Sequence, residues 1–220
     1  LADFELHPAH TSEGLRDLRE QGVKAVFGAD CVRACDVHRF VYAVVSPGVD
    51  TTVGPVADLV AAGLPLVSEI ELAWLRAGRP CVAVTGTNGK TTTTQIIELM
   101  LNACGKRTRA SGNIGPAFSR QVLSGEVLDI DTVEVSSFQL ETIRRFHPRG
   151  VVWTNFAEDH LDRYPDMATY RRAKLRIFEN QTEEDFAVVN VRDELPGLRA
   201  ERITFSAYVG GGDFELKDGA

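Results

Sequence analysis

Short apolar runs alternate along the chain with longer segments in which apolar residues recur at helical spacing. The short runs predict strands at Lys24–Phe27, Phe40–Val45, Leu66–Val67, Cys81–Val84, Thr132–Val135, Val151–Trp153 and Phe186–Asn190. The helical spacing predicts helices at Ser12–Gln21, Val53–Ala62, Glu69–Leu75, Lys90–Ala103, Pro116–Leu123, Phe138–Arg145 and Met167–Glu179. This order of strands and helices is typical of an α/β fold with a mostly parallel sheet.

Two stretches interrupt the alternation. The turn-rich segment Arg76–Pro80 predicts a domain boundary, which gives one domain at 1–78 and a second at 79–220. After Asn190 the chain becomes strand-like, with glycines at Gly210–Gly212, and this pattern predicts a small β-excursion.

Composition narrows the classes of function. Of the 220 residues 44% are hydrophobic and 25% charged, which is ordinary for a globular protein. The net charge of −7 argues against nucleic acid as a partner, because phosphate backbones need a broad basic surface. No apolar run has the length that crosses a bilayer, so we expect no membrane partner.

The four cysteines show no disulfide framework, which indicates a cytoplasmic location. Cys31, Cys35 and His38 have a spacing that zinc could use, but a fourth ligand is missing. Partly buried thiols are the better interpretation of these cysteines.

A glycine- and threonine-rich loop follows the strand predicted at Cys81–Val84. The residues Thr85-Gly-Thr-Asn-Gly-Lys-Thr91 lead directly into a predicted helix. A strand, a glycine-rich turn and a helix N-terminus point several backbone N–H groups at one position, which favours a phosphate. Lys90 is then placed for the terminal phosphates, and the Thr91 hydroxyl for Mg²⁺.

The loop departs from the general phosphate-loop pattern at one position. That pattern places its first glycine at 84, where this chain has Val84, so the loop is a variant form. The alternative is an ordinary glycine turn with a solvated lysine.

Three further segments carry candidate chemistry. Glu134 stands near the end of a predicted strand, where a carboxylate can hold Mg²⁺, although a solvated edge residue is the common case. Asp159, His160 and Asp162 follow another strand in the same way, and the alternative for His160 is a structural role. Lys174 lies among arginines on a predicted helix, which on spacing alone is a basic solvated face.

Five segments taken together resemble the Mur ligases, a family of ATP-dependent amino-acid-adding enzymes of peptidoglycan precursor synthesis. They are Thr85-Gly-Thr-Asn-Gly-Lys-Thr91, Gly112-Asn-Ile-Gly115, Glu134-Val-Ser-Ser-Phe-Gln-Leu-Glu141, Asp159-His-Leu-Asp-Arg-Tyr164 and Tyr170-Arg-Arg-Ala-Lys174. The Ser-Ser-Phe-Gln-Leu-Glu run is most similar to the branch that adds D-glutamate. The resemblance covers roughly 41–190.

The resemblance implies a role for each matching residue. The ATP phosphates would be held by Gly86, Thr87, Asn88, Gly89, Lys90, Thr91 and Thr92. Two Mg²⁺ ions would be held by Thr91, Glu134, His160 and Lys174, with CO₂ bound to Lys174 as a carbamate. The catalytic residues would be Lys90, His160 and Lys174, and the substrate would be contacted by Ser46, Pro47, Gly48, Asn113, Ser136 and Gln139.

The resemblance also implies a fold and a reaction. The fold would be a partial Rossmann-like N-terminal domain that binds the UDP substrate, followed by a P-loop NTPase-like central domain. The reaction would join D-glutamate to UDP-N-acetylmuramoyl-L-alanine through an acyl phosphate, as an ATP-dependent carbon–nitrogen ligase. We expect a monomer that is incomplete at both ends relative to the family, without the C-terminal ligase domain.

Two other functions stay open at this point. A folylpolyglutamate-synthase-like ligase shares the loop and the carbamate lysine, although Phe138-Gln139 and Ser46-Pro47-Gly48 disfavour it. The chain could also be a nucleotide-binding fragment without an activity of its own.

Overall fold

A computed structural model describes residues 20, 22, 37–206 and 210–216. The chain divides into two compact units, one formed by residues 1–43 with 50–65 and the other by residues 44–49 with 66–220. The predicted domain boundary at 76–80 stays a prediction. The strand expected at Lys24–Phe27, the helix expected at Ser12–Gln21 and the cysteines Cys31 and Cys35 lie outside the described residues, except for residue 20 of that helix.

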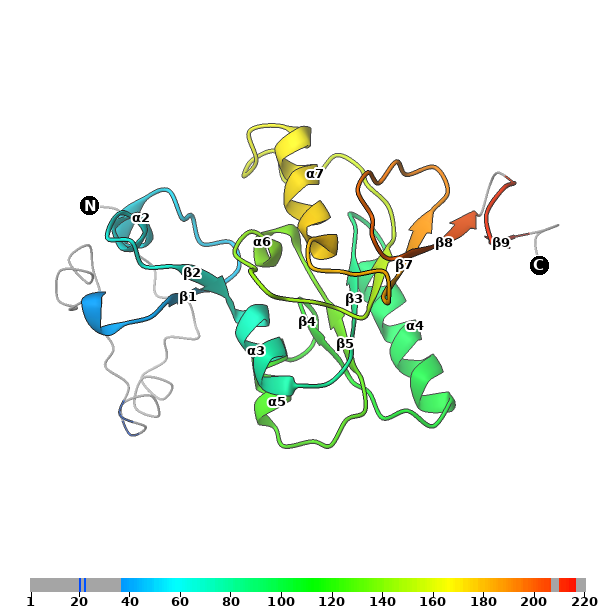
Figure 1. Ribbon diagram of the computed structural model, residues 1–220, viewed down its shortest axis with the longest axis horizontal. Helices are drawn as coiled ribbons and strands as arrows, with labels where there is room; N and C mark the ends of the chain where they lie inside the picture. Colours follow the sequence, from blue (N-terminus) through cyan, green and yellow to red (C-terminus); the bar gives the residue numbers. More distant parts are fainter. Residues whose placement is uncertain (1–19, 21, 23–36, 207–209, 217–220) are drawn as a thin grey trace. The chain divides into compact units, whose positions relative to one another are not determined.

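The second unit is built on a sheet of seven parallel strands (Figure 1). Their spatial order is β4-β5-β3-β6-β7-β8-β9. In chain order the strands are β3 (Cys81–Thr85), β4 (Ala110–Gly112), β5 (Asp131–Glu134), β6 (Gly150–Trp153), β7 (Phe186–Asn190), β8 (Glu201–Ser206) and β9 (Phe214–Glu215). The predicted parallel α/β sheet is therefore confirmed.

Strand β3 lies between β5 and β6, where the direction of winding reverses. The chain runs from β3 outward to β4, returns to β5, and then crosses β3 to reach β6 on its other side. In open α/β sheets the space beyond the carboxyl ends of the strands at such a reversal is where ligands bind. The segment that follows β3 is the glycine–lysine loop.

The helices of this unit cover the sheet unequally. They are α3 (Glu69–Ala77), α4 (Lys90–Ala103), α5 (Phe118–Leu123), α6 (Ser137–Leu140) and α7 (Met167–Leu175), and a 3₁₀ turn, η3 (Arg176–Phe178), extends α7. One core cluster joins Ile70 of α3, Phe118 of α5 and Ile177 of η3 to buried strand residues such as Ala83 and Val151. No α4 residue belongs to this cluster, so α4 packs on the opposite face.

Few helices and strands precede residue 69 in the described part of the chain. A 3₁₀ turn, η2 (Val37–Arg39), precedes strand β1 (Ala43–Val45), and helix α2 (Gly54–Ala61) begins with a proline in its first turn. Strand β1 and strand β2 (Leu66–Ser68) form a separate two-stranded sheet. The strand predicted at Phe40–Val45 is thus shorter than expected.

The helix expected at Phe138–Arg145 is wrong in length, since α6 ends at Leu140. The cause is the carboxylate of Glu71, which lies on α3 and is only 2% exposed. It accepts the backbone N–H groups of Arg144 (3.0 Å), Arg145 (2.9 Å) and Phe146 (2.8 Å). These groups are therefore unavailable to helical carbonyls, and the chain turns toward β6 instead.

Two other differences concern strands. The sequence did not predict β4, because three residues of mixed polarity carry too little periodicity. The β-excursion expected after Asn190 is in fact β8 and β9, which extend the main sheet in parallel.

We predict that Glu71→Ala lowers the free energy of unfolding by about 3 kcal/mol, because it leaves three backbone donors without their acceptor. Urea unfolding measures the change. Glu71→Gln keeps one acceptor oxygen and should cost less. Glu179→Ala, at a side chain that is 48% exposed, is the control and should change little. Equal effects of Glu71→Ala and Glu179→Ala would contradict the role given to Glu71.

Candidate functional site

The loop after β3 has the backbone geometry of an anion site. Gly86 has a φ of 140°, and a Cβ at this position would lie 2.0 Å from Thr154 Oγ1. Gly89 has a φ of 80° and precedes the first residue of α4, Lys90. The first N–H groups of any α-helix lack partners within the helix. The 14-residue helix α4 therefore presents free N–H groups and the positive end of its dipole to the loop.

Residues after β6 fix the shape of this loop. The Asn155 side chain accepts from Asn88 N (3.0 Å) and donates to Asn88 O (3.0 Å). Thr154 Oγ1 donates to the same carbonyl at 2.8 Å. Thr87 Oγ1 accepts from Ala157 N at 3.0 Å. The sequence reasoning did not single out Thr154 or Asn155, although their place directly after a strand is the same signal that indicated Glu134.

Lys90 and the threonines after it begin α4. Lys90 Nζ donates to the carbonyl oxygen of Thr87 in its own loop, at 2.8 Å. Thr91 and Thr92 occupy the first turn of α4 and are exposed. The loop thus keeps a cation and two hydroxyl-bearing residues at the helix N-terminus.

Glu134 lies at the carboxyl end of β5 and is 1% exposed. Its Oε2 accepts from Thr91 Oγ1 at 2.7 Å, and its Oε1 accepts from Asn113 Nδ2 at 2.8 Å. Asn113 N also donates to the Glu134 carbonyl at 2.9 Å. The structure therefore brings together three residues that the sequence placed in three separate motifs.

Lys174 is buried, with 1% of the residue exposed, so the basic solvated face expected from spacing alone is wrong at this position. Its Nζ donates to Gly86 O at 2.7 Å and lies 4.8 Å from the centre of the Tyr170 ring. Burial, and next the charge of Lys90, lower the pKa of Lys174 to about 7, against the opposing effect of Asp159 and Glu134. The amine is thus largely neutral at a pH somewhat above 7.

Tyr170 connects the remaining parts of the site and was not predicted. It is fully buried, and its hydroxyl lies 3.4 Å from Thr87 Oγ1. Its ring makes an edge contact with the His160 ring at 5.7 Å. Burial raises the pKa of Tyr170, so its hydroxyl stays protonated at neutral pH.

His160 is held in an uncommon backbone conformation. Its φ is 54°, the one positive value among the described non-glycine residues. Its carbonyl accepts the N–H groups of Arg163 (3.0 Å) and Tyr164 (2.9 Å), and its ring contacts the Phe138 ring in a tilted arrangement, with the ring centres 5.0 Å apart. The side chain stays 38% exposed, beside Asp159. Strain of this kind at a non-glycine residue is frequent at functional sites.

Two groups of predicted substrate residues have different surroundings. Ser136 and Gln139 are buried and form a capping box at the start of α6, in which Ser136 N donates to Gln139 Oε1 at 2.9 Å. Ser46, Pro47 and Gly48 form an exposed turn after β1, and Gly48 has a φ of 80°. Arg163 Nη2 donates to the carbonyl of Val49, next to that turn, at 2.9 Å. The substrate role of both groups stays a prediction.

The donor atoms fit a hard cation. A carboxylate and a threonine hydroxyl meet at Glu134 and Thr91, and Mg²⁺ prefers such oxygen ligands. Within the described residues no three His, Cys, Asp or Glu side chains gather closely enough to hold a metal ion by themselves. The Thr91 hydroxyl is thus a candidate ligand beside the Glu134 carboxylate.

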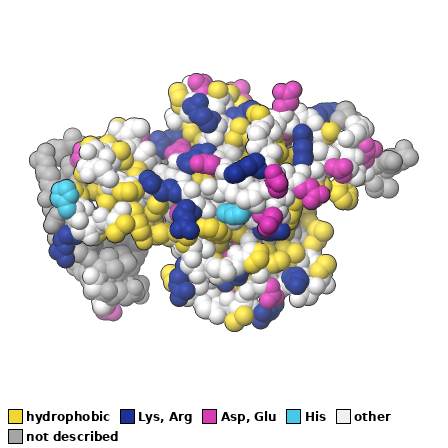
Figure 2. All heavy atoms as spheres, in the orientation of Figure 1, with side chains coloured by type: hydrophobic (Ala, Val, Ile, Leu, Met, Phe, Trp, Pro, Cys, Tyr) yellow, Lys and Arg dark blue, Asp and Glu magenta, His cyan; other side chains and the backbone are white. Residues whose placement is uncertain are grey.

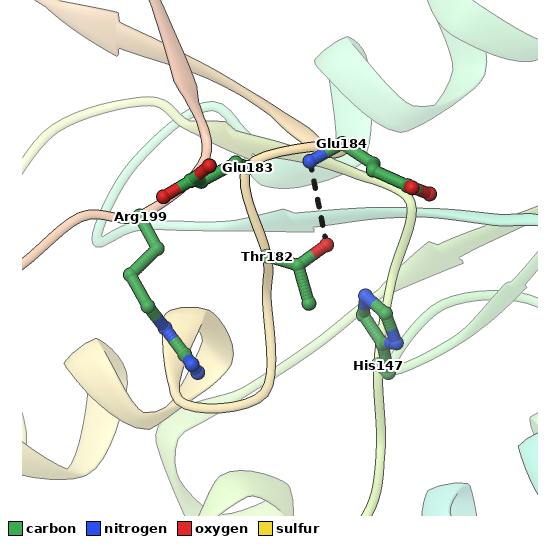
Figure 3. Close-up of a pocket in the computed structure, with 5 residues that line it drawn as sticks. All are labelled: His147, Thr182, Glu183, Glu184 and Arg199. Carbon is green, nitrogen blue, oxygen red and sulfur yellow. Dashed lines mark hydrogen bonds between the residues drawn. The ribbon is translucent and has the colours of Figure 1, made fainter.

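A hollow lies at the other end of the sheet from the glycine–lysine loop (Figure 3). It has a volume of about 550 Å³ and is lined by His147, Thr182, Glu183, Glu184 and Arg199. These residues precede β6, β7 and β8, so the hollow is at the amino ends of the strands. Its His147 and Thr182 bind the buried Asp185 (2.6 and 2.9 Å), an arrangement that joins two turns.

Comparison with known proteins identifies the family. The sequence model of the Mur ligase middle domain matches residues 84–209, which is more than half of the chain. The chain belongs to the Mur ligase family. The match begins in β3 and includes the loop, Glu134, His160 and Lys174.

Two curated relatives carry the same name. A protein of Geotalea daltonii, named UDP-N-acetylmuramoylalanine–D-glutamate ligase, is 46% identical over 187 residues, which cover 84% of this chain and 41% of the relative. One of Geotalea uraniireducens with the same name is 50% identical over 169 residues, covering 76% and 37%. The chain therefore spans about two fifths of the length of the curated relatives it matches.

Solved structures agree on the fold. A crystal structure of the Neisseria meningitides UDP-N-acetylmuramate:L-alanyl-γ-D-glutamyl-meso-diaminopimelate ligase matches with a TM-score of 0.57 and 18% identity, covering 91% of this chain and 68% of that one. At this identity the match shows the fold alone. It confirms the predicted Mur ligase α/β architecture.

We predict that Lys174 titrates near pH 7 in the folded chain when CO₂ is excluded. In the unfolded chain it keeps its ordinary pKa of 10.5, so between these two values only the unfolded state holds the proton. The stability of the fold should therefore rise with pH across this window. NMR titration of ¹³Cε-labelled lysine reports the midpoint, and Lys174→Met should remove both the signal and the rise. A midpoint close to 10.5 would contradict the burial of the amine.

Proposed function

We propose that the full-length protein is an ATP-dependent ligase that adds D-glutamate to UDP-N-acetylmuramoyl-L-alanine in peptidoglycan precursor synthesis. The observation that carries the proposal is that Glu134 accepts hydrogen bonds from Thr91 and Asn113. Buried Lys174 contacts the same glycine–lysine loop. The names of the relatives supply the substrates. The reaction requires ATP and the sugar nucleotide, which supports a location in the cytoplasm.

The loop from Gly86 to Thr92 would bind the ATP phosphates. Its N–H groups and the N-terminus of α4 favour negative charge, and Lys90 can leave the Thr87 carbonyl to reach a phosphate oxygen. Because Gly86 has no Cβ, the loop can approach Thr154 closely. The crystal structure of the Thermotoga maritima MurF ligase, which matches this fold with a TM-score of 0.52, is a complex with ADP.

Two Mg²⁺ ions would be held by Thr91, Glu134, His160 and a carbamylated Lys174. When bound, the ions would offset the charge of the phosphates and of the attacking carboxylate. The residues of the chain would then fix the positions of these ligands. Asn113 orients the Glu134 carboxylate, and Tyr170 packs between Lys174 and His160.

The neutral amine of Lys174 is the form that reacts with CO₂. Its nitrogen bonds to the carbon of CO₂ and loses a proton to solvent, which leaves an anionic carbamate on a long stem. The low pKa of Lys174 favours this form at neutral pH, and nearby Lys90 favours the negative charge that results.

The reaction has two steps at the substrate carboxylate. A carboxylate oxygen attacks the γ-phosphorus of ATP, the bond to ADP breaks, and an acyl phosphate forms. The D-glutamate nitrogen then attacks the acyl carbon and loses a proton as inorganic phosphate leaves. Lys90 would stabilise the charge on the transferring phosphoryl group. Asn113, Ser136, Gln139 and the turn of Ser46, Pro47 and Gly48 would position the substrate.

We predict that the full-length protein releases phosphate from ATP only when UDP-N-acetylmuramoyl-L-alanine and D-glutamate are both present. The assay compares D-glutamate with L-alanine and diaminopimelate, and the sugar nucleotide with a folate. Turnover with diaminopimelate or with the folate would replace the proposed function by that of another ligase. ATP binding without phosphate release under any of these conditions would indicate a binding protein.

We predict that Lys174→Ala reduces turnover of the full-length protein by at least about 10³-fold, since a charged group that stabilises the transition state is lost. Added acetate should restore part of the rate, because a small carboxylate can occupy the place of the carbamate. Arg172→Ala on the same helix, at an exposed residue, is the control and should keep normal turnover. Normal turnover of Lys174→Ala would exclude the carbamate role.

A further inference from the structure

Asn155, the second residue after β6, makes two hydrogen bonds to one residue of the glycine–lysine loop. Its Oδ1 accepts from Asn88 N and its Nδ2 donates to Asn88 O, both at 3.0 Å. A backbone N–H can only donate and a carbonyl can only accept, so these two partners fix the orientation of the amide. Neither a carboxylate nor an aliphatic side chain can make both bonds.

The backbone around Asn155 runs alongside the first half of the loop. Thr154 N donates to Thr85 O, and Thr87 N donates to Asn155 O, both at 3.0 Å. Gly86 lies between these contacts, where a Cβ would come within 2.0 Å of Thr154 Oγ1 and 3.0 Å of Asn155 O. The segment after β6 therefore holds residues 85–88 of the loop through backbone and side chain together.

These contacts divide the N–H groups of the loop into two sets. Those of Thr87 and Asn88 donate to Asn155 and are thus used within the protein. Those of the next four residues, 89–92, donate to no acceptor in the part of the chain that the structure describes. Thr93 N is the next group that donates, to the carbonyl oxygen of the first residue of that set. A phosphate at this loop therefore has the N–H groups of residues 89–92 left to it.

The direction of these four N–H groups depends on the residue before them. Gly89 follows Asn88 directly, has a φ of 80° and turns the chain from the loop into α4. Asn88 is exposed, and its backbone is held by the side chains of Asn155 and Thr154. Asn155 thus connects the end of β6 to the turn at which the unpaired N–H groups begin.

Surface charge offers a nucleotide little attraction of its own. The chain has a net charge of −7, and Figure 2 shows acidic and basic side chains interspersed over the face that it displays. Affinity for a phosphate should therefore depend on local groups, chiefly Lys90 and the N–H groups of residues 89–92. A change in the geometry of the loop should then appear directly in the Kd of the nucleotide.

We propose that Asn155 is a positioning residue for ATP. By holding Asn88 at both its N–H and its carbonyl, it keeps the N–H groups of residues 89–92 directed at one phosphate position before the nucleotide arrives. A loop that is already ordered loses less conformational entropy on binding, which raises affinity. The inference rests on the proposed function, since it takes this loop to be the ATP site. Loss of Asn155 should weaken nucleotide binding more than it slows the chemical steps.

Calorimetric titration of the full-length protein with ADP and Mg²⁺ tests the inference without turnover. Asn155→Ala should raise the Kd for ADP at least about ten-fold, because two hydrogen bonds that order the loop are lost. Asn155→Asp, which has nearly the same shape, should raise the Kd further, since a carboxylate oxygen would face the Asn88 carbonyl and add negative charge beside the phosphates. A wild-type Kd in either variant would overturn the inference.

Asn180→Ala is the matched control for a loss that is merely structural. Asn180 Nδ2 donates to Arg144 O (3.2 Å) and Phe146 O (3.0 Å), before the amino ends of β6 and β7. This variant also loses two bonds from an asparagine to the backbone, and it should keep the wild-type Kd for ADP. Unfolded protein lowers the measured number of sites and leaves the Kd of the folded fraction unchanged. A Kd raised equally in Asn155→Ala and Asn180→Ala would overturn the inference.

Turnover of the full-length protein gives a second measurement. Asn155→Ala should raise KM for ATP, change kcat by less than about three-fold, and leave KM for the sugar nucleotide unchanged. An unchanged KM for ATP with a lowered kcat would contradict a positioning role.

The failure of this inference is distinguishable from the failure of the proposed function. If the variants change the Kd for ADP as expected but the wild-type protein does not ligate D-glutamate, only the proposed function is wrong. If the wild-type protein ligates D-glutamate and Asn155→Ala binds ADP normally, only the role given to Asn155 is wrong.

Discussion

The hydrogen bond between the Thr91 hydroxyl and the Glu134 carboxylate connects the two halves of the site. It joins the first turn of α4 to the carboxyl end of β5. The Glu134 side chain is buried. A buried carboxylate is costly unless its oxygens are satisfied, and here the second oxygen accepts from Asn113. The position of the helix N-terminus is thus fixed by a group that is itself a candidate metal ligand. The glycine–lysine loop and the proposed cation site are therefore parts of one arrangement.

A pair of lysines beside the loop is the second main feature of the site. Two lysines, Lys90 and Lys174, contact the same short loop through Thr87 O and Gly86 O. Burial disfavours the charged form of Lys174, and the nearby charge of Lys90 adds to this effect, so the pKa of Lys174 falls. The structure thus places the Lys90 side chain and the buried amine of Lys174 on neighbouring carbonyls of one loop.

The parallel sheet, the loop and the helix after it were predictable because their signals are local. The strand, the glycines and the 14-residue helix follow one another directly, and α4 has the predicted bounds. The length of α6 was not predictable, since its end depends on Glu71, which lies some 70 residues earlier in the chain. Burial of Lys174 was equally hidden, because spacing shows only that charged neighbours are present. Tyr170 stood in a family motif without a role of its own, since its contacts with Thr87 and His160 exist only after folding.

The side chains at the two ends of the parallel strands differ in kind. At the carboxyl ends, exposed or strained groups such as Asn88 and His160 are held in place by their neighbours. At the amino ends, buried carboxylates close turns: Asp131 pairs with Arg79, and Asp185 binds His147 and Thr182. Despite its burial, the hydrogen bonds from His147 and Thr182 lower the pKa of Asp185, so its charge contributes to stability at neutral pH. Because the two sets of charges lie at opposite ends of the same strands, the carboxylates that are paired at the amino ends are not residues of the candidate site. A substitution at the amino ends should therefore alter folding before it alters the chemistry at the loop.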